Sequence, residues 1–70
     1  MVDISYSDHA KRRMRQRGIT ELEVESVLAH PYYIKKSFEG RKEALGIVKN
    51  RAIKVEFIEI ERHIRVITVM

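Results

Sequence analysis

Residues 7–20 read SDHAKRRMRQRGIT and contain the strongest helix signal of the chain. Ser7 is a suitable N-cap and Gly18 a suitable helix end, and the residues between them include no proline, glycine or β-branched side chain. Ala10 and Met14 form a narrow apolar stripe that we expect to pack on the rest of the protein. The stretch therefore predicts an amphipathic helix, around which the other elements are organised.

A second helix is predicted directly after the first. Thr20 and Glu23 have the spacing of a capping box, in which each side chain bonds to the other residue's backbone N–H. Apolar residues follow at helical spacing, and Pro31 stops the helix, so we place it at residues 21–29. Two consecutive helices with a short connection are expected to pack as a hairpin.

The rest of the chain has the apolar patterns of β-strands. The predicted strands cover residues 2–6, 33–38, 43–49, 52–60 and 64–69. The last of these is almost wholly apolar, which indicates a central position in the sheet. The order β-α-α-β-β-β-β predicts an α+β fold, with the helical hairpin packed on an antiparallel sheet.

Three local features refine this prediction. Asn50-Arg51 is expected to form a two-residue hairpin turn. Gly46, inside a strand, indicates either a bulge or a close approach of another segment. The apolar positions change face near Phe57-Ile58, which predicts a bulge there or a strand buried on both faces.

Composition limits the class of protein. A chain of 70 residues is expected to form one domain, residues 1–70, whose small core and strand edges also favour association, for example as a homodimer. The chain has no cysteine, no apolar run near the roughly 18 residues of a membrane span, and no signal-peptide pattern. We therefore expect a soluble, cytoplasmic protein without a disulfide.

The distribution of charge points to a polyanionic partner. The net charge is +4, and residues 1–18 hold five basic against two acidic residues, while residues 35–54 hold seven against two. On the first helix His9, Arg13 and Arg17 recur every fourth residue, each step climbing roughly 6 Å along the axis. That spacing resembles the separation of neighbouring phosphates along a nucleic-acid strand.

A longer pattern resembles a known family. The string His9-Ala10-x-x-Arg13-Met14-x-x-Arg17-Gly18-Ile19, followed by the capped helix and Pro31, is similar to domain-of-unknown-function family 4258. That family is related to the BrnT and RelE-like ribonuclease toxins, and the similarity covers essentially the whole chain. The resemblance implies a RelE/BrnT-like fold. It also implies a toxin of a toxin–antitoxin system: a metal-independent endoribonuclease, or a degenerate relative, neutralised by a cognate antitoxin protein.

The resemblance also assigns roles on the first helix. Metal-independent RNA cleavage needs a base, an acid and cations that stabilise the charged phosphorane. His9 is the candidate base or acid, and Arg13 and Arg17 are candidates for binding the scissile phosphate. RelE-like toxins often use a tyrosine near the C-terminus, whereas this chain has no tyrosine after Tyr33.

Further candidates come from outside this helix. His63, Arg65 and Thr68 are weaker catalytic candidates, and strand alternation places Thr68 on the other face from the first two unless a bulge intervenes. The remaining predicted nucleic-acid contacts are Arg12, Lys35, Lys36, Arg41 and Lys42. No metal or cofactor is expected, because the three histidines lie far apart without ligand spacing.

Other readings stay open at this point. His9 has a structural alternative, a hydrogen bond to a backbone carbonyl, and Arg13 and Arg17 have one in ion pairs with Glu21 or Glu25. The chain as a whole is also compatible with a non-catalytic nucleic-acid-binding module or a protein-interaction module. A helix-turn-helix is disfavoured, because its second helix would be acidic.

Overall fold

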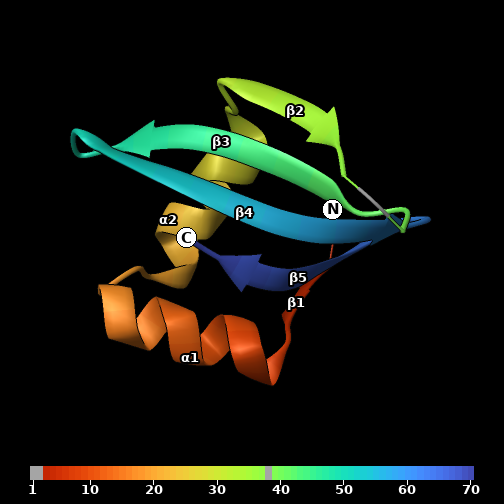
Figure 1. Cartoon of the computed structure of the whole chain (residues 1–70), viewed down its shortest axis with the longest axis horizontal. Helices are drawn as coiled ribbons and strands as arrows, with labels where there is room; N and C mark the ends of the chain where they lie inside the picture. Colours follow the sequence, from red (N-terminus) through yellow and green to blue (C-terminus); the bar gives the residue numbers. More distant parts are fainter. Residues whose placement is uncertain (1–2, 38) are drawn as a thin grey trace.

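The computed structural model describes residues 3–37 and 39–70 and has the order β1-α1-α2-β2-β3-β4-β5 (Figure 1). The elements are β1 (Asp3–Tyr6), α1 (Asp8–Arg17), α2 (Glu21–Ala29), β2 (Tyr33–Lys36), β3 (Lys42–Val48), β4 (Arg51–Ile60) and β5 (His63–Val69). This order confirms the predicted α+β class and the limits of both helices. Positions 2 and 38 of the predicted strands lie outside the described residues.

The five strands form one sheet in the order β1-β5-β4-β3-β2. Strands β2 to β5 pair antiparallel, as predicted, and β5 lies inside the sheet between β1 and β4. Strand β1 pairs with β5 in parallel, with Ile4 opposite Ile64, so the complete sheet is mixed. The parallel pair arises because the chain crosses from β1 through both helices and three strands before it returns beside its own start.

Both helices cover the same face of this sheet. Helix α1 packs on β5, and α2 packs on β3 and β4, so each helix contacts the sheet more than it contacts the other helix. Strand residues that alternate along β3, β4 and β5 meet the helices from one side. The core consists of Ala10, Met14, Ile19, Val24, Val27, Ala44, Ile53, Val55, Phe57, Val66 and Val69.

The β3–β4 turn is Lys49-Asn50, one residue earlier than predicted. Both residues have a positive φ, 53° and 64°, as a two-residue type I′ turn requires. Val48 pairs with Arg51 and closes the turn. The prediction of an Asn50-Arg51 turn was therefore wrong, and Arg51 is instead the first residue of β4.

A bulge interrupts the β4–β5 pairing close to the position predicted from the sequence. Glu56 pairs with Thr68, whereas the next residue, Phe57, pairs with Val66, so Ile67 is the extra residue. The bulge thus lies in β5 and not in β4, where the apolar pattern had placed it. Because of this extra residue, Thr68 lies on the same face of the sheet as Arg65, opposite Ile58, the face away from the helices.

Gly46 permits a close approach of α2 to β3, one of the two predicted alternatives. A Cβ atom at this position would lie 2.9 Å and 3.0 Å from the two methyl groups of Val27 and 3.1 Å from its Cα. We expect Gly46→Ala to lower the free energy of unfolding by about 1–3 kcal/mol, measured by urea denaturation. Adding Val27→Ala removes the methyl groups, so the two costs should combine less than additively. Fully additive costs would contradict the proposed clash.

The Tyr6 hydroxyl is buried without a hydrogen-bond partner among the described residues. Burial raises the pKa of Tyr6 to about 12, and the nearby carboxylates of Glu21 and Glu25 add to the shift. The folded protein therefore keeps this proton more tightly than the unfolded chain, whose tyrosine titrates near pH 10. Ionisation of Tyr6 therefore favours the unfolded chain. This effect is absent below about pH 10, and it lowers the free energy of unfolding as the pH rises toward 12.

We expect Tyr6→Phe to weaken this alkaline loss and to raise the free energy of unfolding at pH 7 by about 1 kcal/mol, because an unpaired buried hydroxyl disappears. Denaturant titrations between pH 7 and pH 11 measure both effects. Tyr32→Phe is the matched control, since Tyr32 is 77% exposed. An unchanged pH dependence in Tyr6→Phe would show that other groups cause the loss.

Candidate nucleic-acid interface

The first turn of α1 is fixed to β5 by Ser7. The Ser7 hydroxyl accepts a hydrogen bond from the Ala10 backbone N–H at 3.0 Å and donates one to the Ile67 carbonyl at 2.7 Å. The Ser7 backbone N–H donates to the Val66 carbonyl at 3.0 Å. The predicted N-cap is thus confirmed, and it also attaches the helix to the sheet beside the β5 bulge.

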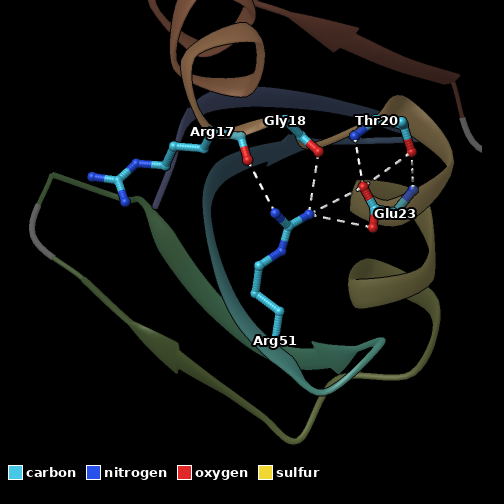
Figure 2. Close-up of polar contacts among 5 residues, drawn as sticks. All are labelled: Arg17, Gly18, Thr20, Glu23 and Arg51. Carbon is cyan, nitrogen blue, oxygen red and sulfur yellow. Dashed lines mark hydrogen bonds and ion pairs between the residues drawn. The ribbon is translucent and has the colours of Figure 1, made fainter.

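The last turn of α1 is held by the side chain of Arg51, at the start of β4 (Figure 2). Its guanidinium donates to the carbonyls of Arg17 at 3.0 Å and Gly18 at 3.3 Å. It also contacts both carboxylate oxygens of Glu23 at 3.3 Å. Gly18 has a φ of 64°, the left-handed conformation that ends the helix and aims these carbonyls at β4.

Glu23 serves both Arg51 and the predicted capping box. Its carboxylate accepts from the Thr20 backbone N–H at 2.9 Å, while the Thr20 hydroxyl accepts from the Glu23 backbone N–H at 3.2 Å. The hydrogen bond from the Thr20 backbone lowers the pKa of Glu23 most, and Arg51 lowers it further. Sequence reasoning missed Arg51, because its partners lie 28 to 34 residues earlier in the chain.

Anchored at both ends, α1 exposes an unpaired cationic surface. Ala10 and Met14 face the core, His9 and Arg17 are exposed, and Arg13 is half-buried at the side. Within residues 3–37 and 39–70, the basic side chains of this helix form no ion pair with a carboxylate. These side chains are Lys11, Arg12, Arg13, Arg15 and Arg17.

The two structural alternatives for the predicted site residues of α1 are therefore not realised among the described residues. Arg13 and Arg17 are not paired with Glu21 or Glu25 there. The side chain of His9 likewise makes no hydrogen bond to a described residue. These side chains are available to an external ligand.

The basic residues of the β2–β3 hairpin behave differently. Lys35 lies 3.6 Å from Glu43, Arg41 lies 3.0 Å from Glu56, and Lys42 lies 3.0 Å from Glu59. Three of the predicted nucleic-acid contacts are thus neutralised by the sheet. In the described part of the chain, Lys36 and Arg12 have no ion pair. Arg12 belongs to the group of five unpaired cations on α1, whereas Lys36 is the unpaired cation of the hairpin.

The weaker candidates His63, Arg65 and Thr68 lie on the sheet face opposite the helices. The Nε2 atom of His63 is 2.8 Å from the Ser5 hydroxyl, a partner on β1 that sequence reasoning did not find. In the described residues, no hydrogen bond or ion pair joins these three side chains to the candidates on α1. The sheet separates the two groups, so they do not form one site.

Two further observations concern ligands and membranes. No three histidine, aspartate or glutamate side chains of the described residues are grouped so that they could hold a metal ion. Neither helix in this part of the chain has the length and apolar composition to cross a membrane.

Residues 6–70 match the family described as a domain of unknown function, DUF4258. The chain belongs to this family. No curated protein and no solved structure matches the chain significantly. Helix α1, its anchors Ser7 and Arg51 and the candidate His9 all lie within the segment that matches DUF4258.

We expect Arg51→Ala to lower the free energy of unfolding of this DUF4258 protein by about 1 kcal/mol, because the exposed pair with Glu23 is weak but two helix-end carbonyls lose their donor. Hydrogen exchange at Ile19 should accelerate, since its N–H bonds to the Met14 carbonyl at the freed helix end. Arg62→Ala, an exposed arginine in the β4–β5 turn, is the control. Equal effects of both substitutions would contradict an anchoring role for Arg51.

Proposed function

We propose that this DUF4258 protein binds RNA through α1 and cleaves it without a metal ion, as the toxin of a toxin–antitoxin system. The observation that carries the proposal is the set of unpaired cations on α1, with an exposed histidine, His9, at the N-terminal end of the same helix. The string from His9 to Ile19 resembles the DUF4258 pattern, and the expected relationship of that family to the BrnT and RelE-like toxins supports the step from binding to cleavage.

Phosphate binding follows from the charge balance of α1. An arginine that is already paired must give up its carboxylate before it binds a phosphate, whereas Arg13 and Arg17 have no carboxylate to give up among the described residues. Guanidinium groups also bind phosphate oxygens in pairs, with two parallel hydrogen bonds. Arg13 and Arg17 lie about one helical turn apart, and this spacing suits two successive phosphates of one RNA strand.

His9 would transfer the proton in the cleavage step. The ribose 2′-oxygen attacks the adjacent phosphorus, the O2′–P bond forms and the P–O5′ bond breaks. The products are a 2′,3′-cyclic phosphate and a free 5′-hydroxyl. His9 takes the 2′-hydroxyl proton or supplies the proton to the leaving 5′-oxygen, with water serving the other transfer. Arg13, half-buried and therefore restrained, stabilises the extra negative charge on the phosphorane.

The toxin assignment brings a partner and a place of action. A cellular ribonuclease acting on RNA, including ribosome-associated messenger RNA, works in the cytoplasm and needs a cognate antitoxin protein to neutralise it. Covering the basic surface of α1 would block RNA binding directly. No cofactor enters this scheme, and homodimerisation is compatible with it.

The second candidate is a non-catalytic RNA-binding module. It is favoured because His63 lies on the other side of the sheet from α1, so His63 cannot serve as the second acid or base beside His9. In this function α1, and not the acidic α2, contacts the nucleic acid, since α2 begins with Glu21 and Glu23 and repels phosphate.

The purified protein should cleave RNA in the presence of EDTA and leave 2′,3′-cyclic phosphate ends. His9→Ala is expected to lower the cleavage rate by about 100-fold or more while RNA affinity stays nearly unchanged. Arg13→Ala and Arg17→Ala should each weaken binding and reduce its salt dependence by about one phosphate contact. Lys42→Ala is the matched control, because Lys42 is paired with Glu59 and should matter less.

Circular dichroism must show that each variant is folded before its activity is compared. Salt-dependent RNA binding without cleavage by the wild type would assign the non-catalytic module instead. Absence of both binding and cleavage would contradict the whole proposal. Growth arrest on induced expression, lost in folded His9→Ala, would connect cleavage with toxicity.

A further inference from the structure

The sheet face opposite the helices is uncovered in the described structure. On β4, Ile53, Val55 and Phe57 face the helices, so by alternation Lys54, Glu56, Ile58 and Ile60 point to the open side. Both helices pack on the other face. Antiparallel sheets commonly leave one face to solvent, so the residues on this face decide whether it can bind a partner.

Aliphatic side chains lie at both ends of this open face. Ile47 is 60% exposed, and Leu45 is half-buried beside it on β3. At the other end of β4, Ile60 is 59% exposed and Ile58 is half-buried. We call these four residues the open-face patch: two aliphatic pairs on one face of the sheet, separated by Glu43 and Glu56.

Each end of the open-face patch has its own unpaired cation. Lys54 is the cross-strand neighbour of Leu45, and Arg65 is the cross-strand neighbour of Ile58. Neither cation has an ion pair within residues 3–37 and 39–70. Between the two ends, the carboxylates of Glu43 and Glu56 are compensated by the ion pairs of the β2–β3 hairpin.

We propose that the open-face patch binds an acidic amphipathic helix of a partner protein. Its apolar face would cover the aliphatic residues, and its carboxylates would pair with Lys54 and Arg65. From Ala52, opposite Ile47, to Ile60 the strand rises about 26 Å at roughly 3.3 Å per residue. That length corresponds to about five helical turns.

Charge favours this occupant over a second copy of the chain. A second copy would bring the same unpaired cations and a net charge of +4. RNA is disfavoured because the most exposed side chains of the patch, Ile47 and Ile60, are aliphatic. The neighbouring rings of Tyr33 and His63 are half-buried and hydrogen-bonded to Glu43 and Ser5, so neither offers a free face for stacking a base. The patch and α1 lie on opposite sides of the sheet, so this inference stands or fails independently of the proposed RNA binding.

A fluorescent synthetic helix of about 18 residues, with leucines on one face and glutamates on the other, is the probe. Fluorescence anisotropy should detect binding, and NMR shift changes should map it to β3, β4 and β5. The double variant Lys54→Glu/Arg65→Glu should lose at least 10-fold in affinity for this probe and gain affinity for a matched leucine–lysine helix. Ile60→Lys should also weaken binding, whereas Leu22→Lys, at a 77% exposed position of α2, should not.

Three results would overturn the inference. The acidic probe is also attracted by α1, so shift changes centred there, with affinity lost in Arg12→Glu/Arg15→Glu and kept in the Lys54/Arg65 variant, would exclude the patch. Absence of binding to either surface would also exclude it. Sedimentation of the protein alone as a dimer that Ile60→Lys dissociates would make a second copy the occupant.

Discussion

The guanidinium of Arg51 connects the C-terminal end of helix α1 and the capping box of α2 to strand β4. It donates to the last carbonyls of α1 and contacts the carboxylate that caps α2, while its own backbone begins β4 (Figure 2). A cation at this helix end is favourable, because α1 presents the negative end of its dipole there. Five like-charged side chains on α1 repel one another. The helix therefore depends on its anchors, Ser7 at one end and Arg51 at the other, and on the burial of Ala10 and Met14.

The distribution of ion pairs divides the surface of the protein into areas of different charge and polarity. Lys35, Arg41 and Lys42 of the β2–β3 hairpin are paired with sheet carboxylates, whereas the cations of α1 have no ion pair among the described residues. The open sheet face combines aliphatic residues with Lys54 and Arg65. An RNA ligand on α1 and a protein ligand on the open face would lie on opposite sides of the sheet. The two proposed interactions are thus compatible at the same time, and a partner on the open face need not block α1.

Membership of the DUF4258 family shows which proteins the chain is related to, but it does not assign an activity to the chain. Function must then be argued from the site. The strongest local argument is the availability of His9 beside Arg13 and Arg17, since a group bound inside the protein would have to be released before it could act on RNA. The geometry gives less support to His63, whose Nε2 atom already contacts Ser5 on the far side of the sheet.

The sequence by itself determined both helices to the residue. Their caps are satisfied within four positions along the chain, so Ser7, Gly18 and the Thr20–Glu23 box predict them locally. Alternation likewise predicted the strands, and the glycine inside β3 predicted either a bulge or a close approach, of which the structure has the close approach. Only the tertiary structure decided the parallel pairing of β1 with β5, the turn at Lys49-Asn50, the bulge at Ile67 and which cations are paired. The strand pairing, the bulge and the ion pairs depend on contacts between segments distant in the chain, which local propensity does not encode. The turn is local, but its position is set by the β3–β4 register, which pairs Val48 with Arg51.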